Sequence, residues 1–133
     1  MGVWTVKRGT DKWTDEHFVL AIVQAPDQSF VFVICQGGQV SAQVRIGTSD
    51  WSPYKTRKIR WRVDHKVPHD AKWRQSVEET GVVVSGLQAL EFADLVSHAA
   101  SRLIFKNSTG TRTFSVRGST AAIGVVMTAC GKS

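Results

Sequence analysis

The chain has 133 residues, the usual length of one domain with its own core, and its 42% hydrophobic and 21% charged residues exclude a disordered chain. No apolar run approaches the ~20 residues that cross a bilayer, so a transmembrane segment is not expected. The net charge of +6 and the pI of 9.8 favour anionic partners such as phosphate, lipid head groups, nucleic acid or an acidic protein face.

The beginning of the chain, residues 1–4, lacks the basic and then apolar pattern of a signal peptide. Two explanations stay open: the protein is cytoplasmic, or a signal peptide has been removed and a start codon placed before the mature chain.

Alternation with a period of two dominates the first two thirds of the chain and predicts short strands. The expected strands cover residues 4–8, 17–24, 29–36, 40–46, 57–64, 71–77 and 80–85. The segment 29–36 is apolar on both sides, as expected of a central strand covered on both faces. Gly37 and Gly38 indicate a hairpin turn after it.

After residue 85 the hydrophobic period becomes helical. Ser85 and Gln88 have the spacing of a capping box and predict a helix over residues 87–100. A hairpin of residues 102–107 and 111–117 follows, and Ser119 is the expected N-cap of a last helix that ends at Ala129. We therefore expect a mostly β protein with two helices: a single domain over residues 1–133, built as a curled antiparallel sheet or a β-sandwich.

The two cysteines are Cys35, in the most apolar strand, and Cys130, on the buried stripe of the last helix. Both sulfurs should point to the interior, either as one disulfide or as two buried thiols. A bond between them would tie the last helix to the central strand.

No residue pattern indicates catalysis, a cofactor or a metal. Gly131, Lys132 and Ser133 look like the end of a phosphate-binding loop, but the required earlier glycine and the following helix are missing. His65 and His69 are four residues apart, yet Pro68 makes this segment a turn and not a helix that presents two ligands. We expect a protein that is not an enzyme.

The best candidate for a binding site is a basic hairpin. Alternation places Lys58, Arg60 and Arg62 on one face of the strand 57–64, and Lys72 and Arg74 on the strand 71–77. If these strands pair with Trp61 and Trp73 pointing inward, the five cations gather on one face, where an anion would relieve their repulsion. The alternative is a solvated outer face without a ligand.

A second candidate is the loop between residues 47 and 56, which carries Trp51 and Tyr54. An exposed aromatic pair beside a basic face suits contact with carbohydrate, peptide or nucleic-acid bases. The alternative is that both aromatic rings fold back onto the sheet.

The order of these features resembles the VasI/TagO type of type VI secretion-associated proteins, a group of small exported bacterial proteins. The resemblance spans nearly the whole chain and is carried by the following segments: Trp4-Thr5-Val6, Cys35, Arg60-Trp61-Arg62-Val63-Asp64, Trp73-Arg74-Gln75-Ser76, Thr113-Phe114-Ser115-Val116-Arg117-Gly118 and Cys130. It implies a periplasmic domain, a Cys35–Cys130 disulfide and an accessory role. Family members often carry two adjacent acids where this chain has Asp64 and His65.

The leading hypothesis is an exported, periplasmic or secreted accessory protein without enzymatic activity, which binds an anionic or protein partner through the basic face. The alternatives are a cytoplasmic, phage-encoded module that binds nucleic acid or an acidic protein, and a hydrolase with a site that the sequence does not reveal.

Overall fold

A computed structural model of the chain describes residues 2–46, 56–75, 81–107 and 110–132. This part of the chain is mostly β with two helices, as expected. The strands are β1 (Thr5–Thr10), β2 (His17–Gln24), β3 (Phe30–Gln36), β4 (Gln39–Arg45), β5 (Thr56–Val63), β6 (His69–Gln75), β7 (Gly81–Ser85), β8 (Arg102–Lys106) and β9 (Thr111–Ser115). The helices are α1 (Leu87–Ser97) and α2 (Ser119–Ala129).

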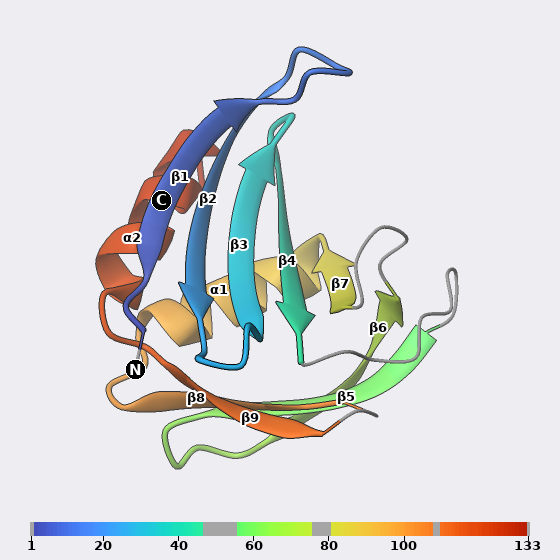
Figure 1. The fold of residues 1–133 in the computed structure, drawn as a ribbon, viewed down its shortest axis with the longest axis vertical. Helices are drawn as coiled ribbons and strands as arrows, with labels where there is room; N and C mark the ends of the chain where they lie inside the picture. Colours follow the sequence, from blue (N-terminus) through green and yellow to red (C-terminus); the bar gives the residue numbers. More distant parts are fainter. Residues whose placement is uncertain (1, 47–55, 76–80, 108–109, 133) are drawn as a thin grey trace.

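All nine strands belong to one antiparallel sheet in the order β1-β2-β3-β4-β7-β6-β5-β8-β9. Strands β1 to β4 stand side by side, while β5, β6, β8 and β9 cross beneath them at a steep angle (Figure 1). Of the two expected architectures, the curled antiparallel sheet is therefore the one observed. The sheet does not close, because β1 and β9 remain its two edges.

Trp4 connects the two edge strands at one end of the sheet. Its backbone N–H donates to the carbonyl oxygen of Arg117 at 2.9 Å, and its indole Nε1 donates to the carbonyl oxygen of Ser115 at 2.7 Å. Gly118 has a left-handed φ of 83°, and a Cβ there would lie 3.3 Å from the Trp4 carbonyl oxygen. This close approach holds the start of β1 against the end of β9 without a ladder between them.

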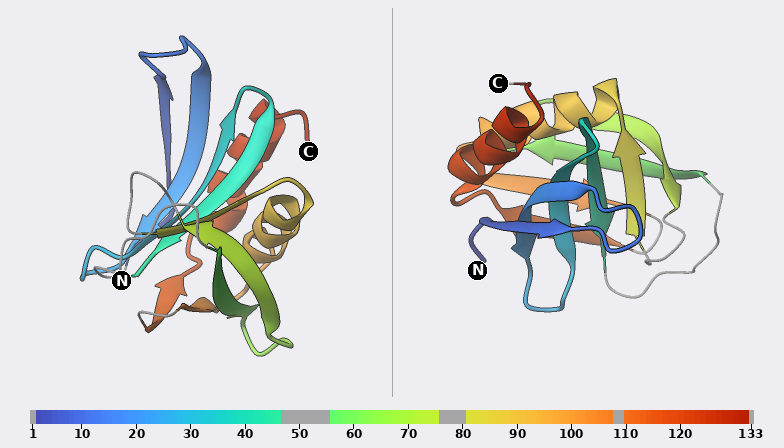
Figure 2. Two further views of the ribbon diagram at one scale, coloured as in Figure 1. Left: turned by 90° about the vertical axis from the view of Figure 1, so that its right-hand side faces the viewer. Right: turned by 90° about the horizontal axis from the view of Figure 1, so that it is seen from above.

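Both helices lie on the concave side of the bent sheet (Figure 2). Helix α2 packs on β2 and β3, and α1 packs on β4, β7 and α2. The side chains that face the helices are small and fully buried: Ala21, Val23, Val31, Val33, Ala42 and Val44. Since an interior is close-packed, small side chains allow the helices to approach the strands.

The larger apolar residues of β2 and β3 alternate with these small ones and lie on the outer, convex face. They are only half-buried: Phe18, Leu20, Ile22, Phe30, Phe32 and Ile34. The expectation that the segment 29–36 is covered on both faces is therefore wrong, because its helix-facing side is sealed and its outer side stays partly exposed. The space under the helices selects the smaller side chains, so the bulky ones turn outward.

Phe92 of α1 anchors the crossing strands to the helix. It is 0% exposed, and its ring centroid lies 4.9 Å from that of Trp61 on β5 and 5.3 Å from that of Trp73 on β6, both edge-on. The Phe105 ring of β8 packs against Trp73 at 5.2 Å. One aromatic cluster thus fixes the positions of three neighbouring strands relative to α1.

Cys35 and Cys130 form a disulfide with a Cα–Cα distance of 5.7 Å, which confirms the expected pairing. The bond links β3 to the residue that follows α2, across 95 positions of sequence. It adds a covalent connection to the packing of α2 on the sheet.

The N-cap residue of each helix differs from the predicted one. Helix α1 has Gly86 at its N-cap, with a left-handed φ of 71° and no side-chain hydrogen bond, so the capping box of Ser85 and Gln88 does not form. Helix α2 has Gly118 at its N-cap, and Ser119 is already helical. The Ser119 hydroxyl donates to the carbonyl oxygen of Val96 at 3.0 Å instead, because the two helices pack together there.

Neither α1 nor α2, and no other helix within the described ranges, has the length and apolar character needed to traverse a bilayer.

Candidate functional site

The basic hairpin consists of β5 and β6, which pair antiparallel with Trp61 and Trp73 facing the core. Since side chains alternate along a strand and directly opposite residues share a face, the predicted cations lie on the outer face. This set comprises Lys58, Arg60, Arg62, Lys72 and Arg74. Of these, only Arg62 is half-buried; the other four are exposed.

Arg60 is already neutralised within this face. Its Nε and Nη2 donate to the two carboxylate oxygens of Asp70, directly opposite, at 2.6 and 3.1 Å. The hydrogen bond from Arg60 holds the pKa of Asp70 below its usual value. Because this pair is well exposed, its contribution to stability is small, and its main effect is to orient the guanidinium group.

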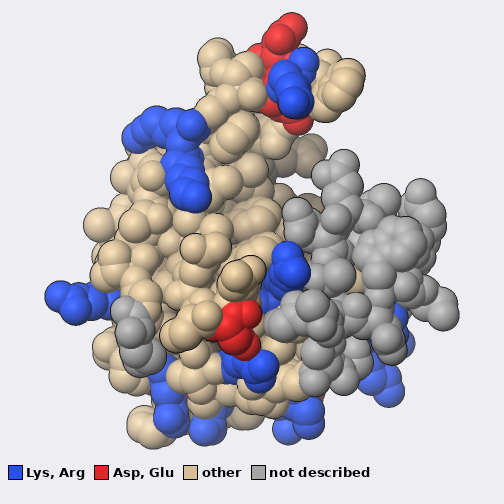
Figure 3. Space-filling view, in the orientation of Figure 1, with Lys and Arg blue, Asp and Glu red and all other residues tan. Residues whose placement is uncertain are grey.

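Lys58 and Lys72 face each other across the same ladder, and Lys106 of β8 lies opposite Arg60 on its other side. All three lysines are exposed, and none has an anionic partner among the residues that the structure describes. In Figure 3, lysine and arginine side chains gather along the lower edge of the molecule, where β5 and β8 run in Figure 1. Among the described residues, Asp70 thus neutralises Arg60, and no acid pairs with the three lysines.

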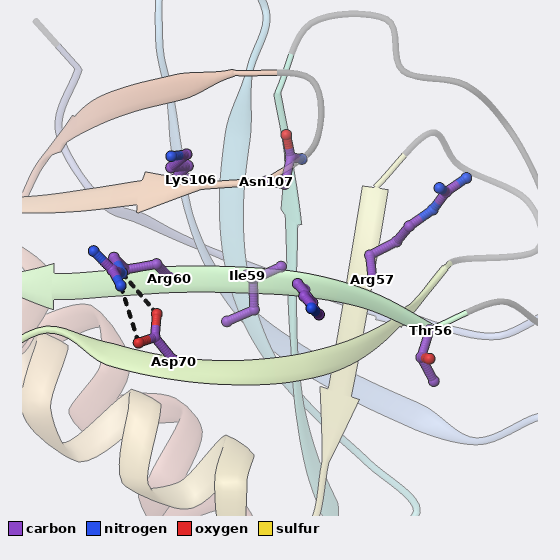
Figure 4. A pocket seen from close by; sticks show the side chains of 8 residues that line it. Thr56, Arg57, Ile59, Arg60, Asp70, Lys106 and Asn107 are labelled. Atoms are coloured by element: carbon purple, nitrogen blue, oxygen red, sulfur yellow. Dashed lines mark hydrogen bonds and ion pairs between the residues drawn. The ribbon is translucent and has the colours of Figure 1, made fainter.

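A groove of about 530 Å³ lies on this face. Its lining comes from three segments of the sheet: Thr56, Arg57, Lys58, Ile59, Arg60, Asp70, Lys106 and Asn107. In Figure 4, Arg60 turns toward Asp70, while Lys106 projects from the neighbouring strand beside it. With two lysines that have no acidic partner among the described residues and an oriented guanidinium, the groove can accept the oxygens of a carboxylate or a phosphate.

A smaller cavity of about 270 Å³ adjoins this groove and shares Arg60 and Lys106 with it. Its other lining residues include Pro68, Ile104 and Arg62. The aliphatic stems of the long cationic side chains can line such an apolar space while their charged ends stay in water. The face thus combines a groove lined by cationic side chains with an apolar recess.

Sequence reasoning missed Lys106, Asn107 and Arg57 as groove residues. The alternation of Leu103 and Phe105 toward the core does indicate that Lys106 points outward. Its position beside Arg60, however, depends on the β5–β8 pairing between distant parts of the chain, which no local pattern reveals. Arg57 and Asn107 carry no signal that marks them for this site.

The other predicted binding residues, Trp51 and Tyr54, lie outside the described residues. The candidate metal ligands do not converge either: His69 stacks on Trp61 at 4.4 Å, while His65 lies 3.4 Å from Arg102. Among the described residues, no group of three or more His, Cys, Asp or Glu side chains is placed to hold a metal ion.

One arrangement at the end of α1 resembles a catalytic triad in composition only. The Nδ1 atom of His98 lies 3.2 Å from the hydroxyl of Ser97 and 3.5 Å from the carboxylate of Asp94. A triad needs the histidine to contact serine with one ring nitrogen and the acid with the other. Both contacts here use the same nitrogen on an exposed helix end, so this group has no relay geometry.

Comparisons of the chain with protein-family models, with curated proteins and with solved structures found no match. The resemblance to VasI/TagO-type proteins therefore stays a prediction from the sequence.

Proposed function

We propose that this protein is an exported accessory protein without enzymatic activity, which binds an anionic partner on the outer face of β5, β6 and β8. The observation that carries the proposal is the groove in which Lys58 and Lys106 flank the Arg60–Asp70 pair and have no acidic partner in the part of the chain that the structure describes. We call the outer surface of these three strands the basic face.

The charges of the strands themselves support an anionic ligand. Asp70 is the one acidic residue in β5, β6 and β8, all of which the structure describes in full. Like charges directly opposite in a ladder destabilise a sheet. The Lys58–Lys72 pair is therefore unfavourable in the free protein, and a bound anion removes this cost.

The disulfide supports the exported location. Structural disulfides form and persist in oxidising compartments such as the periplasm, whereas cytosolic thiols are usually kept reduced. A nucleic acid in the cytosol would fit the same charges, but the Cys35–Cys130 disulfide would not be expected in that reducing compartment. We therefore favour a partner in the cell envelope.

The proposal is tested with poly-L-glutamate as an anionic probe, titrated into the protein at several salt concentrations. We expect binding that weakens steeply with salt and is lost in the double variant Lys58→Glu, Lys106→Glu. The matched control is Lys7→Glu, Arg8→Glu, which changes the net charge equally on the exposed side chains of β1. Equal loss of binding in both double variants would show that only total charge matters and would overturn the proposal.

A single-stranded oligonucleotide in the same titration separates the alternative partner. Tighter binding of the oligonucleotide than of poly-L-glutamate at equal charge, dependent on Lys58 and Lys106, would favour nucleic acid and contradict the envelope ligand.

A further inference from the structure

The cations of the basic face are spread over a surface and do not converge on one point. Along β5, Lys58 and Arg62 are separated by four residues, which is about 13 Å of strand. Across the sheet, Lys106 of β8 and Lys72 of β6 lie on strands that are two strand spacings apart, or about 10 Å. Such an area exceeds a single phosphate or carboxylate and suits a ligand that presents several anionic groups in a plane.

An exposed apolar residue lies at the edge of this face. Val67, in the turn between β5 and β6, is 80% exposed and stands between Lys66 and Pro68. In Figure 1 this turn is the lowest part of the molecule, at the end of the crossing strands. A valine in this position contributes nothing to the core, and its neighbour Pro68 lines a cavity together with Arg60 and Lys106 of the basic face.

The turn itself is firmly held, so the exposure of Val67 does not come from a frayed end. The Asp64 backbone N–H donates to the Arg102 carbonyl oxygen at 2.9 Å, and the Lys66 N–H donates to the Val63 carbonyl oxygen at 3.0 Å. The Asp64 carboxylate accepts further hydrogen bonds from the backbone of Ala100 and Ser101 at 2.9 and 2.7 Å. The residues that lead into Val67 are therefore held to the fold by hydrogen bonds.

The apolar recess connects this turn with the groove lined by cationic side chains. It is lined by Pro68 from the turn and by Ile104 from β8, and it shares Arg60 and Lys106 with the groove. Cations that reach the lipid phosphates beside an exposed apolar tip that reaches further inward match the order of phosphates and then glycerol in a bilayer surface.

We propose that the basic face docks onto an anionic phospholipid membrane. Lys58, Lys72 and Lys106 then contact lipid phosphates, and Val67 and Pro68 enter the head-group layer. This inference rests on the proposed function, since it names the anionic partner of the same face. An acidic protein would need the charges equally, but it would not need the exposed apolar tip beside them.

The test is co-sedimentation of the protein with phosphatidylcholine vesicles, with and without about 30 mol% phosphatidylglycerol, in about 0.1 M NaCl. We expect binding only to the anionic vesicles. Each basic residue near such a surface contributes about fivefold to the binding constant, so Lys58→Glu with Lys72→Glu should weaken it about 25-fold or more. The control Lys7→Glu, Arg8→Glu should retain most of the binding.

Val67→Ser distinguishes a membrane from other anionic partners. Loss of the apolar tip should weaken vesicle binding about threefold or more while leaving poly-L-glutamate binding unchanged. Because Val67 is so exposed, this variant should fold normally, and its circular dichroism spectrum provides the check.

The outcomes separate the two proposals. Binding of poly-L-glutamate through Lys58 and Lys106, without binding to anionic vesicles, leaves the proposed function standing and overturns the membrane inference. Vesicle binding that is equal for Val67→Ser and the unchanged protein also overturns it. Failure to bind either probe overturns the proposed function itself.

Discussion

Lys58 lies directly opposite Lys72 in the β5–β6 ladder, and neither ammonium group has an anionic partner among the described residues. The next pair on the same face of this ladder, Arg60 and Asp70, is compensated by an ion pair at 2.6 Å. One ladder therefore contains a neutralised pair beside a repulsive pair. This arrangement connects the stability of the hairpin with its affinity for anions, and both can be measured.

Lys72→Glu should stabilise the free protein while weakening anion binding. The change places a carboxylate opposite Lys58 and converts repulsion into attraction, worth about 0.2–1 kcal/mol in a sheet. Urea unfolding at low salt measures the gain, which should shrink in about 1 M salt because exposed charges are screened. The control with the same change in net charge is Lys7→Glu on β1, because Lys7 lies opposite the uncharged Leu20 of β2. A less stable Lys72→Glu variant would contradict the repulsion.

Protonation of Asp64 should destabilise the fold at low pH. Hydrogen bonds from the backbone N–H groups of Ala100 and Ser101 hold the pKa of this carboxyl far below its usual value. In the unfolded chain its pKa is near ~3.9, so the unfolded state takes up the proton first as the pH falls. The stabilisation is therefore present above about pH 5 and is lost as the pH falls toward the lower pKa of the folded state. The pKa of Asp27, lowered to about 2 mainly by a hydrogen bond from Arg112, acts in the same direction.

Asp64→Asn tests this dependence. Asparagine tolerates the left-handed backbone of residue 64, whose φ is 53°, but it lacks the charge that the N–H groups stabilise. We expect a loss of roughly 1–3 kcal/mol near pH 7 and a flatter decline of stability below pH 4. Asp15→Asn is the matched control, because Asp15 has a similar φ of 61° and no hydrogen bond to its carboxylate among the described residues. Identical pH profiles for both variants would exclude Asp64 as the cause.

Loss of the Cys35–Cys130 bond should lower stability strongly without changing the fold. For a loop of 95 residues, the chain-entropy model gives roughly 4–5 kcal/mol. Thermal unfolding should shift to lower temperature when the protein is reduced, and the double variant Cys35→Ala, Cys130→Ala should unfold at the same temperature with and without reductant. A reductant effect on that double variant would mean that the shift has another origin.

Phe92→Ala should separate α1 from the crossing strands. The side chain is fully buried between Trp61 and Trp73, and removal of a buried phenylalanine costs about 3–5 kcal/mol. Phe92→Leu should cost less, since it keeps most of the volume. Leu87→Ala on the same helix, where the side chain is 84% exposed, should change stability by less than about 0.5 kcal/mol. Chemical denaturation of the three variants measures this order, and equal effects at residues 87 and 92 would contradict the packing.

The strands and helices could be predicted because their signals are local. The segment His17–Gln24 was predicted with both of its bounds, and the basic strand 57–64 differs from β5 by one residue at each end. Alternation with Trp61 and Trp73 inward was enough to place Lys58 and Lys72 outward. Helix caps were less predictable, because Gly86 and Gly118 occupy the N-cap positions in place of serines. Ser85 precedes the cap of α1, and the Ser119 hydroxyl donates a hydrogen bond to Val96 of α1.

Composition and alternation by themselves determined the β-rich class, the two helices near the end of the chain, the inward direction of both cysteines and the basic face of one hairpin. Only the tertiary structure decided that β8 lies beside β5, which brings Lys106 to Arg60 and creates the groove. It also decided that the bulky side chains of β2 and β3 face outward, since the helices leave room for small ones alone. Periodicity records which residues share a face, whereas the pairing of distant strands and the filling of an interior depend on contacts between residues far apart in sequence.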